Sequence, residues 1–333
     1  MQPAFSNFKK TAERMLRTAG GPYAALVLLL IVCCASNESF RSVQNLVNIM
    51  RQVSYSGMIA LGMTFVIAAG GIDLSVGSLL ALSGVLSILG MNALPVSPEW
   101  AAVIAGVIAV GVGAVGGTAN GLLVSVGKIP PFIATLGTMV IFRSLALYFA
   151  DSGLVSTENE VFRTIGDASF ACLPLPVWAL LALTLLLSVL LFMTRFGRHV
   201  CAVGSNERVA RYSGIRTGLV KYGTYLIAGL ASGVAAFLFG GRLNAVSSTS
   251  AGTSYELDAI AAVIIGGSSM NGGRATVWGT LAGVLILGIV SNVLDMWGIS
   301  VTLQGTVKGI VIIVAVMIQR KRGWKIPILS RKS

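Results

Sequence analysis

Long apolar runs and short polar connections alternate along almost the whole chain. Runs of about 20 apolar residues, the length that crosses a bilayer as one helix, occur about ten times. They cover residues 22–39, 53–70, 74–94, 99–123, 131–150, 174–194, 222–240, 257–271, 275–296 and 303–319. The eighth run is short and rich in glycine, so its bounds are the least defined. The pattern predicts an all-α polytopic membrane protein with about ten transmembrane helices, in which residues 1–333 form a single transmembrane domain.

The composition agrees with this fold class and decides how the positive net charge is interpreted. Of the 333 residues 55% are hydrophobic and 11% are charged, whereas a soluble domain has about 25% charged residues. A net charge of +12 would suggest a nucleic-acid partner in a soluble protein. Here the basic residues stand between apolar runs, where they set topology and contact anionic lipid headgroups. We therefore expect membrane lipids and no nucleic acid as partners.

Basic residues gather in three segments, 1–21, 195–221 and 320–333. Ten spans with a cytoplasmic N-terminus place all three in the cytoplasm, as the positive-inside tendency requires. The sequence thus predicts cytoplasmic N- and C-termini and a long cytoplasmic loop at 195–221. The basic N-terminus also imitates a signal peptide, but the spans that follow favour an uncleaved first membrane helix.

The most informative polar residue is Asp73, which stands between two apolar runs in the segment Gly70-Gly71-Ile72-Asp73-Leu74-Ser75-Val76-Gly77. A carboxylate at the centre of a membrane helix costs about 2.5–3.5 kcal/mol on insertion scales. The glycines interrupt helical regularity, and irregular backbone at membrane depth is tolerated only inside protein or beside a water-filled path. Two roles stay open for this segment. Asp73 and Ser75 either line a translocation path, or Asp73 caps the next helix.

A second charge inside an apolar run is Arg143, which we expect to face the bundle or a cavity. Its candidate partners are Asp151, Glu256 and Asp258. Pore lining and structural ion pairing are both compatible with this placement.

Small residues recur at helical spacing within several runs, which predicts close packing of helices. The ridges are Gly113, Gly117 and Gly121; Gly229 and Gly233; and Gly279 and Gly283. The segments 66–85 and 263–284 also resemble one another weakly, because each places a Gly-Gly pair before an apolar run. Transporters often contain such repeats with broken helices.

No enzymatic motif survives inspection of its context. The segment 111–116 matches a dinucleotide fingerprint by letter but lies inside an apolar run. The segment 121–128 has one residue too many for a P-loop, and Ile129 stands where a P-loop has Ser or Thr. His199 is the only histidine, and the four cysteines show no pairing pattern. We expect no cofactor, no metal site, no ATPase activity and no other enzyme chemistry.

The basic segment 195–221 contains the signals of a short helix. Ser205 or Asn206 is a suitable N-cap, Glu207 favours the first turn and Gly214 favours a stop. Glu207 and Arg211 form an i,i+4 pair in the favourable order, and Val209 and Tyr212 would share one side. A solvated loop and a helix that docks a cytoplasmic protein are the two interpretations. The docking residues would be Asn206, Glu207, Arg208, Arg211, Tyr212 and Gly214.

Four segments carry a family resemblance: GMTFVIAAGGIDLSVGSLLALSG (62–84), NGLLVSVGKIPPFIATLGTM (120–139), RFGRHVCAVGSNERVARYSGI (195–215) and YELDAIAAVIIGGSSMNGGRATVWGT (255–280). In these segments the chain resembles the membrane permease subunit of bacterial ABC sugar importers of the ribose/xylose/galactose type. The resemblance implies multi-pass insertion in the bacterial inner membrane and transport of a monosaccharide. It also implies three protein partners: a second permease, identical or paralogous; a cytoplasmic ABC ATPase that docks between spans six and seven; and a periplasmic sugar-binding protein.

Other functions remain alternatives at this point. Branched-chain amino-acid ABC permeases share the architecture, although not the IDLSVGS string. A stand-alone secondary sugar transporter would equally lack a P-loop. A membrane-embedded enzyme would need acidic or histidine residues clustered at one membrane face, which the chain lacks. The residues that we assign to the path or to the helix break are Gly70, Gly71, Asp73, Ser75, Gly77, Arg143 and Asp258. The identity of the sugar, and whether the second permease is a copy or a paralogue, stay open.

Overall fold

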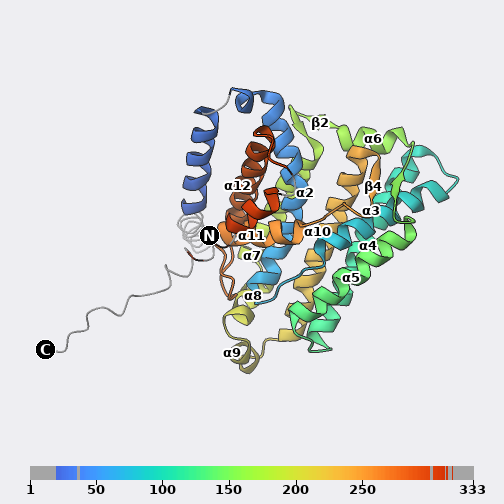
Figure 1. The fold of residues 1–333 in the computed structure, drawn as a ribbon. Coiled ribbons are helices and arrows are strands. Elements are labelled where there is room, and N and C mark those ends of the chain that lie inside the picture. Colours follow the sequence, from blue (N-terminus) through green and yellow to red (C-terminus); the bar gives the residue numbers. More distant parts are fainter. Residues whose placement is uncertain (1–19, 36–37, 301–302, 312, 314–316, 318–333) are drawn as a thin grey trace, which may run out of the picture.

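The computed structural model describes residues 20–35, 38–300, 303–311, 313 and 317, which form a bundle of helices (Figure 1). The expected C-terminal tail 320–333, and the expected N-terminal segment 1–21 except its last two residues, lie outside the described residues.

The described helices follow one another with short connections. A helix at Gly20–Ala35 precedes η1 (Ser39–Arg41), α2 (Val43–Ala68), α3 (Val76–Ala93), α4 (Pro98–Ser125), α5 (Pro131–Phe149), α6 (Glu160–Asp167), α7 (Leu175–Met193), α8 (Arg195–Ser205), α9 (Glu207–Tyr212), α10 (Thr217–Leu243), α11 (Tyr255–Ile265) and α12 (Val277–Met296). Residues 303–311 are again helical. The short strands form two antiparallel pairs. Strand β1 (Leu154–Ser156) pairs with β4 (Ala245–Ser247), and β2 (Ser169–Phe170) pairs with β3 (Leu173–Pro174).

Six of the described helices, α3, α4, α5, α7, α10 and α12, are long and apolar enough to cross a membrane. The polytopic helical class is therefore confirmed, whereas the count of about ten spans is not. The eighth expected span is reduced to α11, which has 11 residues. A helix of that length rises only about 16 Å, about half of a hydrocarbon core of about 30 Å.

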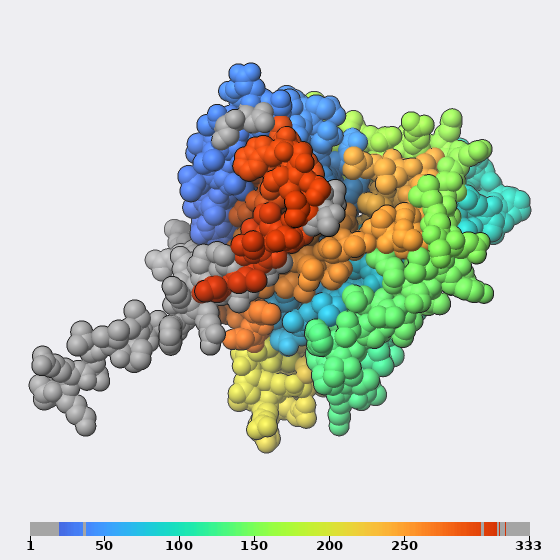
Figure 2. Space-filling model, in the orientation of Figure 1, coloured from blue at the N-terminus to red at the C-terminus, as the bar shows by residue number. Residues whose placement is uncertain are grey.

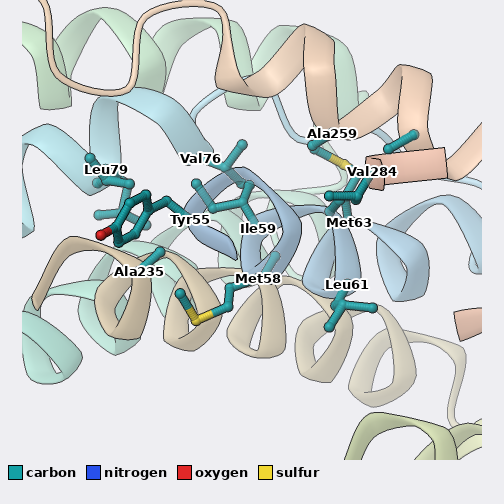
Figure 3. Close-up of a cluster of buried hydrophobic side chains, with 14 of the residues drawn as sticks. Tyr55, Met58, Ile59, Leu61, Met63, Val76, Leu79, Ala235, Ala259 and Val284 are labelled. Carbon is teal, nitrogen blue, oxygen red and sulfur yellow. The ribbon is translucent and has the colours of Figure 1, made fainter. Parts of the chain in front are cut away.

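Helix α2 occupies the centre of the bundle, where its C-terminal part from Val53 to Ala68 is almost entirely buried. Figure 3 shows Tyr55, Met58 and Leu61 of α2 among side chains of neighbouring helices, including Leu79 of α3 and Val284 of α12. Each of these three α2 side chains is at most 1% exposed. The segments on both sides of the Asp73 break are thus fixed in the most buried part of the molecule.

The predicted glycine ridges lie where helices touch. A Cβ atom at Gly117 would come within 2.6 Å of the Tyr225 carbonyl oxygen, and one at Gly113 would meet the Gly229 carbonyl oxygen, so α4 and α10 pack backbone against backbone. Likewise, a Cβ atom at Gly283 would meet the Ala262 carbonyl oxygen, which brings α12 against α11. Close packing through small residues, predicted from the spacing, is confirmed at these contacts.

The two ends of the bundle differ in structure (Figure 1). One end carries α6 and the strand β2, and the opposite end carries α8 and α9. The segment 195–221, expected as a loop with one short helix, instead contains two helices before α10 begins. Thr194 caps α8 by accepting a hydrogen bond from the Gly197 amide at 3.3 Å, a cap that lies just before the segment in which the loop was expected.

Candidate functional site

The first helix break separates α2 from α3 and begins with a Schellman turn. The amide of Gly70 donates to the Ile67 carbonyl and that of Gly71 to the Val66 carbonyl, each at 2.9 Å. Gly70 has φ of +81°, a left-handed conformation that glycine adopts without steric cost. The Gly-Gly pair read from the sequence therefore ends α2 and turns the chain toward α3.

Asp73 is held by a buried hydrogen-bonded network. Its Oδ1 accepts from the Ser75 amide at 2.9 Å and from the Ser75 hydroxyl at 2.7 Å. The Asn120 side-chain amide donates to both carboxylate oxygens at 3.4 Å and to the Ser75 hydroxyl oxygen at 2.7 Å. The Thr138 hydroxyl in turn donates to the Asn120 Oδ1 at 2.7 Å. The network thus joins the break to α4 and α5.

Two further side chains bind the backbone of the same break. The Tyr225 hydroxyl of α10 donates to the Ile72 carbonyl at 3.3 Å, and the Thr135 hydroxyl of α5 donates to the same oxygen at 3.4 Å. Sequence reasoning missed Asn120, Thr135, Thr138 and Tyr225 as members of this site. The one available signal was Asn120, a lone amide within the apolar run 99–123.

The geometry revises the expected capping role of Asp73. Ser75 occupies the N-cap position of α3 and makes no side-chain cap bond, while Asp73 binds Ser75 rather than an amide of the first helical turn. The reason is position: an N-cap side chain reaches the amide two or three residues beyond it, and the amide that Asp73 reaches in this way is that of Ser75, the N-cap residue itself. Asp73 is only 1% exposed and Ser75 is fully buried. Both side chains therefore lie inside the packing between helices, where they fix the geometry of the break.

Gly77, Arg143 and Asp258 lie around the start of α11. A Cβ atom at Gly77 would come within 2.5 Å of a Glu256 carboxylate oxygen, so this glycine lets α11 approach α3. Arg143 donates to the Ser248 carbonyl at 2.8 Å and interacts electrostatically with Glu256, one of its three candidate partners. Asp258 instead pairs with Lys308 at 2.9 Å. Of the three candidate partners of Arg143, Glu256 therefore interacts with it, whereas Asp258 has a different partner.

A second helix break follows α11 and begins with the same turn as the first. Gly267 has φ of +90°, its amide donates to the Ile264 carbonyl at 2.9 Å, and the Ser268 amide donates to the Val263 carbonyl at 3.2 Å. At the far side of this break, the Thr276 hydroxyl accepts from the Gly279 amide at 3.1 Å and caps α12. The two segments that resemble one another in sequence are therefore both helix–break–helix units.

The two units touch each other directly. The hydroxyls of Thr64 in α2 and Thr280 in α12 are 2.9 Å apart and both are buried. The Gly273 amide of the second break donates to the Ala68 carbonyl at the end of α2, also at 2.9 Å. The breaks thus meet at one place in the bundle although about 200 residues of chain separate them.

Helices α8 and α9 form a hairpin-like pair of short helices at one end of the bundle, called the α8–α9 segment below (195–214). The Asn206 side chain caps α9 by accepting from the Val209 amide at 3.1 Å. Gly214, with φ of +81°, ends α9 in a Schellman turn. Asn206 as the N-cap and Gly214 as the stop are therefore both confirmed as local structure.

Glu207 attaches α9 to α10. Its carboxylate accepts from Lys221 at 2.6 Å and from Arg211 at 3.0 Å. The Lys221 hydrogen bond, supported by Arg211, holds the pKa of the Glu207 carboxyl below its ordinary value, although partial burial acts in the opposite direction. The predicted Glu207–Arg211 pair is present, and Lys221 is a second cation that helix spacing could not reveal.

The outer side of α9 is apolar and exposed. Tyr212 is 91% exposed and Val209 is 58% exposed, whereas Ala210 faces the bundle. The exposed residues Arg208 and Arg211 lie on the same short helix. Figure 2 shows the α8–α9 segment in yellow, protruding from the rest of the surface. A large aromatic side chain beside exposed cations is typical of a protein-binding surface.

Within the described part of the chain, no group of three or more histidine, cysteine, aspartate or glutamate side chains could hold a metal ion. No disulfide joins the four cysteines, all of which are described.

Comparison with known proteins identifies relatives that cover nearly the whole chain. The family model described as "Branched-chain amino acid transport system / permease component" matches residues 45–316. The ribose import permease protein of Bacillus subtilis is 45% identical over 304 residues, which make up 91% of this chain and 92% of the relative. The ribose import permease protein of Escherichia coli is 39% identical over 90% of this chain and 92% of its own length. The L-arabinose transport system permease protein of Escherichia coli is 35% identical over 90% of both chains. No solved structure matches the chain.

Proposed function

The chain belongs to the family of branched-chain amino acid transport system permease components, and we propose that it forms the translocation path of an ATP-driven ABC importer for a monosaccharide. Like its relatives, it is a transport subunit rather than an enzyme, and it is a multi-pass membrane protein. The observation that carries the proposal is the 45% identity to a ribose import permease over nine tenths of both chains.

The substrate class follows from the relatives rather than from the family description. The relatives named above import ribose and L-arabinose, both pentoses, so we favour a ribose-type sugar over a branched-chain amino acid. The polar contacts of Arg143 and Asp258 near the start of α11 are the candidate lining of the path. A site that hydrogen-bonds hydroxyl groups discriminates strongly against a ligand that lacks them.

The docking surface for the ATPase is the exposed side of α9. Tyr212, Val209 and Arg208 offer an aromatic anchor, an apolar neighbour and a cation, while the Glu207–Lys221 bond fixes the orientation of the helix. On this proposal the end of the bundle that carries α9 faces the cytoplasm, as do both termini, and the protein resides in the bacterial inner membrane. A periplasmic sugar-binding protein would then approach the end that carries α6, and a second permease copy or paralogue would complete the path.

The test is purification of the tagged chain from native membranes in a gentle detergent, with partners identified by mass spectrometry. We expect recovery of an ABC ATPase with the wild-type chain, and loss of that ATPase with Tyr212→Ala or Arg208→Glu. The matched control is Tyr148→Ala, which removes a tyrosine that is 76% exposed at the end of α5 and should leave ATPase recovery unchanged. Purification without any ATPase, in a detergent that preserves a known importer, would favour a stand-alone transporter.

Substrate choice is tested separately in cells that lack their own pentose uptake systems. Coexpression of the chain with its recovered ATPase and binding protein should restore uptake of labelled ribose or arabinose. Uptake of labelled leucine in place of either sugar would favour the branched-chain amino-acid alternative.

A further inference from the structure

Three chain segments meet backbone against backbone at the base of the α8–α9 segment. They are the end of α2, represented by Ala68 and Gly70; the end of α8, represented by Gly204; and the second break, represented by Gly272 and Gly273. These five residues are called the glycine junction below. The three segments are distant in the sequence: one ends α2, one ends α8 and one belongs to the second break.

The contacts at the glycine junction leave no room for side chains. A Cβ atom at Gly204 would meet the Ala68 carbonyl oxygen and come within 2.6 Å of the Gly273 nitrogen. A Cβ atom at Gly272 would lie 2.8 Å from the Gly204 carbonyl oxygen and 3.0 Å from the Gly70 nitrogen. The Gly273 amide donates to the Ala68 carbonyl at 2.9 Å. Because no flexible side chain lies between these backbones, displacement of one bears directly on the other two, and the segment with fewer bonds to the rest of the bundle is the one that moves.

The glycine junction is also continuous with the exposed helix α9. Only Ser205 and Asn206 separate Gly204 from the first residue of α9. The Asn206 amide donates to the Ala202 carbonyl of α8 at 3.1 Å, and the Asn206 side chain caps α9. A force applied to α9 therefore reaches Gly204 through a short segment whose backbone is bonded on both sides.

The structure assigns to the glycine junction a specific part in transport: Gly204 transmits displacement of the α8–α9 segment to the second helix break. This inference rests on the proposed function, which makes α9 the docking surface of the ATPase. The first break is fixed to α4, α5 and α10 by Asn120, Thr138 and Tyr225. We therefore expect the second break to move with α8, relative to the first. Gly204, Gly272 and Gly273 are positioning residues in this scheme and do not touch the sugar.

The test compares Gly204→Ala with Gly111→Ala and Gly137→Ala. The two control glycines are helical, and a Cβ atom at either one would meet nothing within 4 Å. Each variant is reconstituted with the ATPase and the binding protein, and sugar uptake and ATP hydrolysis are measured in the same vesicles. We expect Gly204→Ala to hydrolyse ATP while importing at least tenfold less sugar per ATP. Both controls should keep the wild-type ratio.

One result would overturn the inference. It is a wild-type sugar-to-ATP ratio in Gly204→Ala, whether uptake and hydrolysis are both retained or both fall in proportion. If the wild-type complex itself shows no ATP-dependent uptake, the proposed function fails, and the inference that rests on it fails as well.

A second measurement covers the case in which Gly204→Ala does not assemble. Spin labels are placed at exposed positions on a cysteine-free background: Ser213 beside α9, Met270 in the second break and Phe132 at the start of α5. When nucleotide is bound to the complex, we expect the distances from 132 to 213 and from 132 to 270 to change together, while that from 213 to 270 is preserved. Independent change of the 213–270 distance, or no change at all, would contradict transmission through the glycine junction.

Discussion

The two helix breaks begin in the same way and are held in different ways. After α2 and after α11 the chain forms the same Schellman turn, with a glycine in the left-handed conformation. The first break then places the Asp73 carboxylate in a network that reaches α4 and α5, and Tyr225 of α10 binds the backbone of the same break. The second break makes mainly local bonds between neutral groups, such as that from the Thr276 amide to the Ser268 hydroxyl oxygen at 3.1 Å.

The difference suggests a division of roles between two similar units. A break fixed by buried bonds to several elements is costly to displace, because each bond that is lost leaves a polar group unsatisfied. A break with local bonds moves as a unit with the helices that it joins. We therefore expect the first break to act as the fixed part of the bundle and the second break to be the part that moves.

The largest expected effect comes from removing the carboxylate of the first break. Asp73→Ala leaves the Ser75 amide, the Ser75 hydroxyl and the Asn120 amide without their acceptor. Since each unsatisfied buried group costs about 1–3 kcal/mol, we expect the free energy of unfolding to fall by at least about 3 kcal/mol. The measurement is thermal unfolding in detergent, monitored by size-exclusion chromatography. Asp73→Asn, which keeps an acceptor for Ser75, should lose less than half as much. Equal loss in the two variants would show that charge, and not the acceptor, stabilises the break.

A smaller effect is expected at the second break. Thr276→Val removes the hydroxyl that caps α12 and should cost about 1 kcal/mol, the usual value for an N-cap. The same unfolding assay measures this cost. The control variant is Thr164→Val, which removes a hydroxyl bonded within the exposed helix α6. A loss as large as that of Asp73→Ala would remove the contrast between the two breaks.

The bond that joins the two units should contribute less again. Thr64 and Thr280 form a buried hydroxyl pair between α2 and α12, and each hydroxyl also bonds to its own helix. We expect a coupling free energy of about 0.5 kcal/mol in the cycle of Thr64→Val, Thr280→Val and the double variant. Additive effects of the two substitutions would mean that the pair does not connect the units.

The smallest expected effect concerns α9, which is connected to the glycine junction through Gly204 near the end of α8. Bonding to Lys221 lowers the folded-state pKa of Glu207 from an ordinary value of 4.5. The stabilisation is therefore complete above pH 4.5 and is lost as the pH falls through the lower folded-state pKa. Because the Glu207 side chain is more than a third exposed, we expect its carboxylate to contribute at most about 0.5 kcal/mol to the free energy of unfolding. Hydrogen exchange of residues 206–215, corrected for intrinsic rates, should show weaker protection at low pH in the wild type. Glu207→Gln should remove that pH dependence, and its persistence in the variant would assign the effect to another group.

Local signals in the sequence were sufficient for the features that depend on neighbouring residues. The glycine pair before Asp73, the Asn206 cap, the Gly214 stop and the Glu207–Arg211 pair all depend on backbone conformation or helix spacing within a few residues. The glycine ridges of α4 and α10 were equally predictable, since only their spacing matters.

Features that depend on distant residues could not be predicted in the same way. Asn120, Thr138 and Tyr225 reach the first break from three helices, and no spacing rule connects them with Asp73. The pairing of Asp258 with Lys308 spans 50 residues, and the bond from Arg143 to the Ser248 carbonyl spans 105 residues. The start of α2 at Val43 was also missed, because the polar residues interspersed among positions 44–52 conceal a helix that extends beyond the apolar run.

ATP-driven sugar uptake in proteoliposomes tests the central claim most directly. The chain would be reconstituted with its recovered ATPase and binding protein, and labelled ribose and arabinose would be offered outside with ATP inside or outside. The account predicts accumulation of one of these sugars against its gradient only when ATP reaches the ATPase, with none in a hydrolysis-deficient complex. Uptake by the chain alone, without the ATPase and without ATP, would contradict the account.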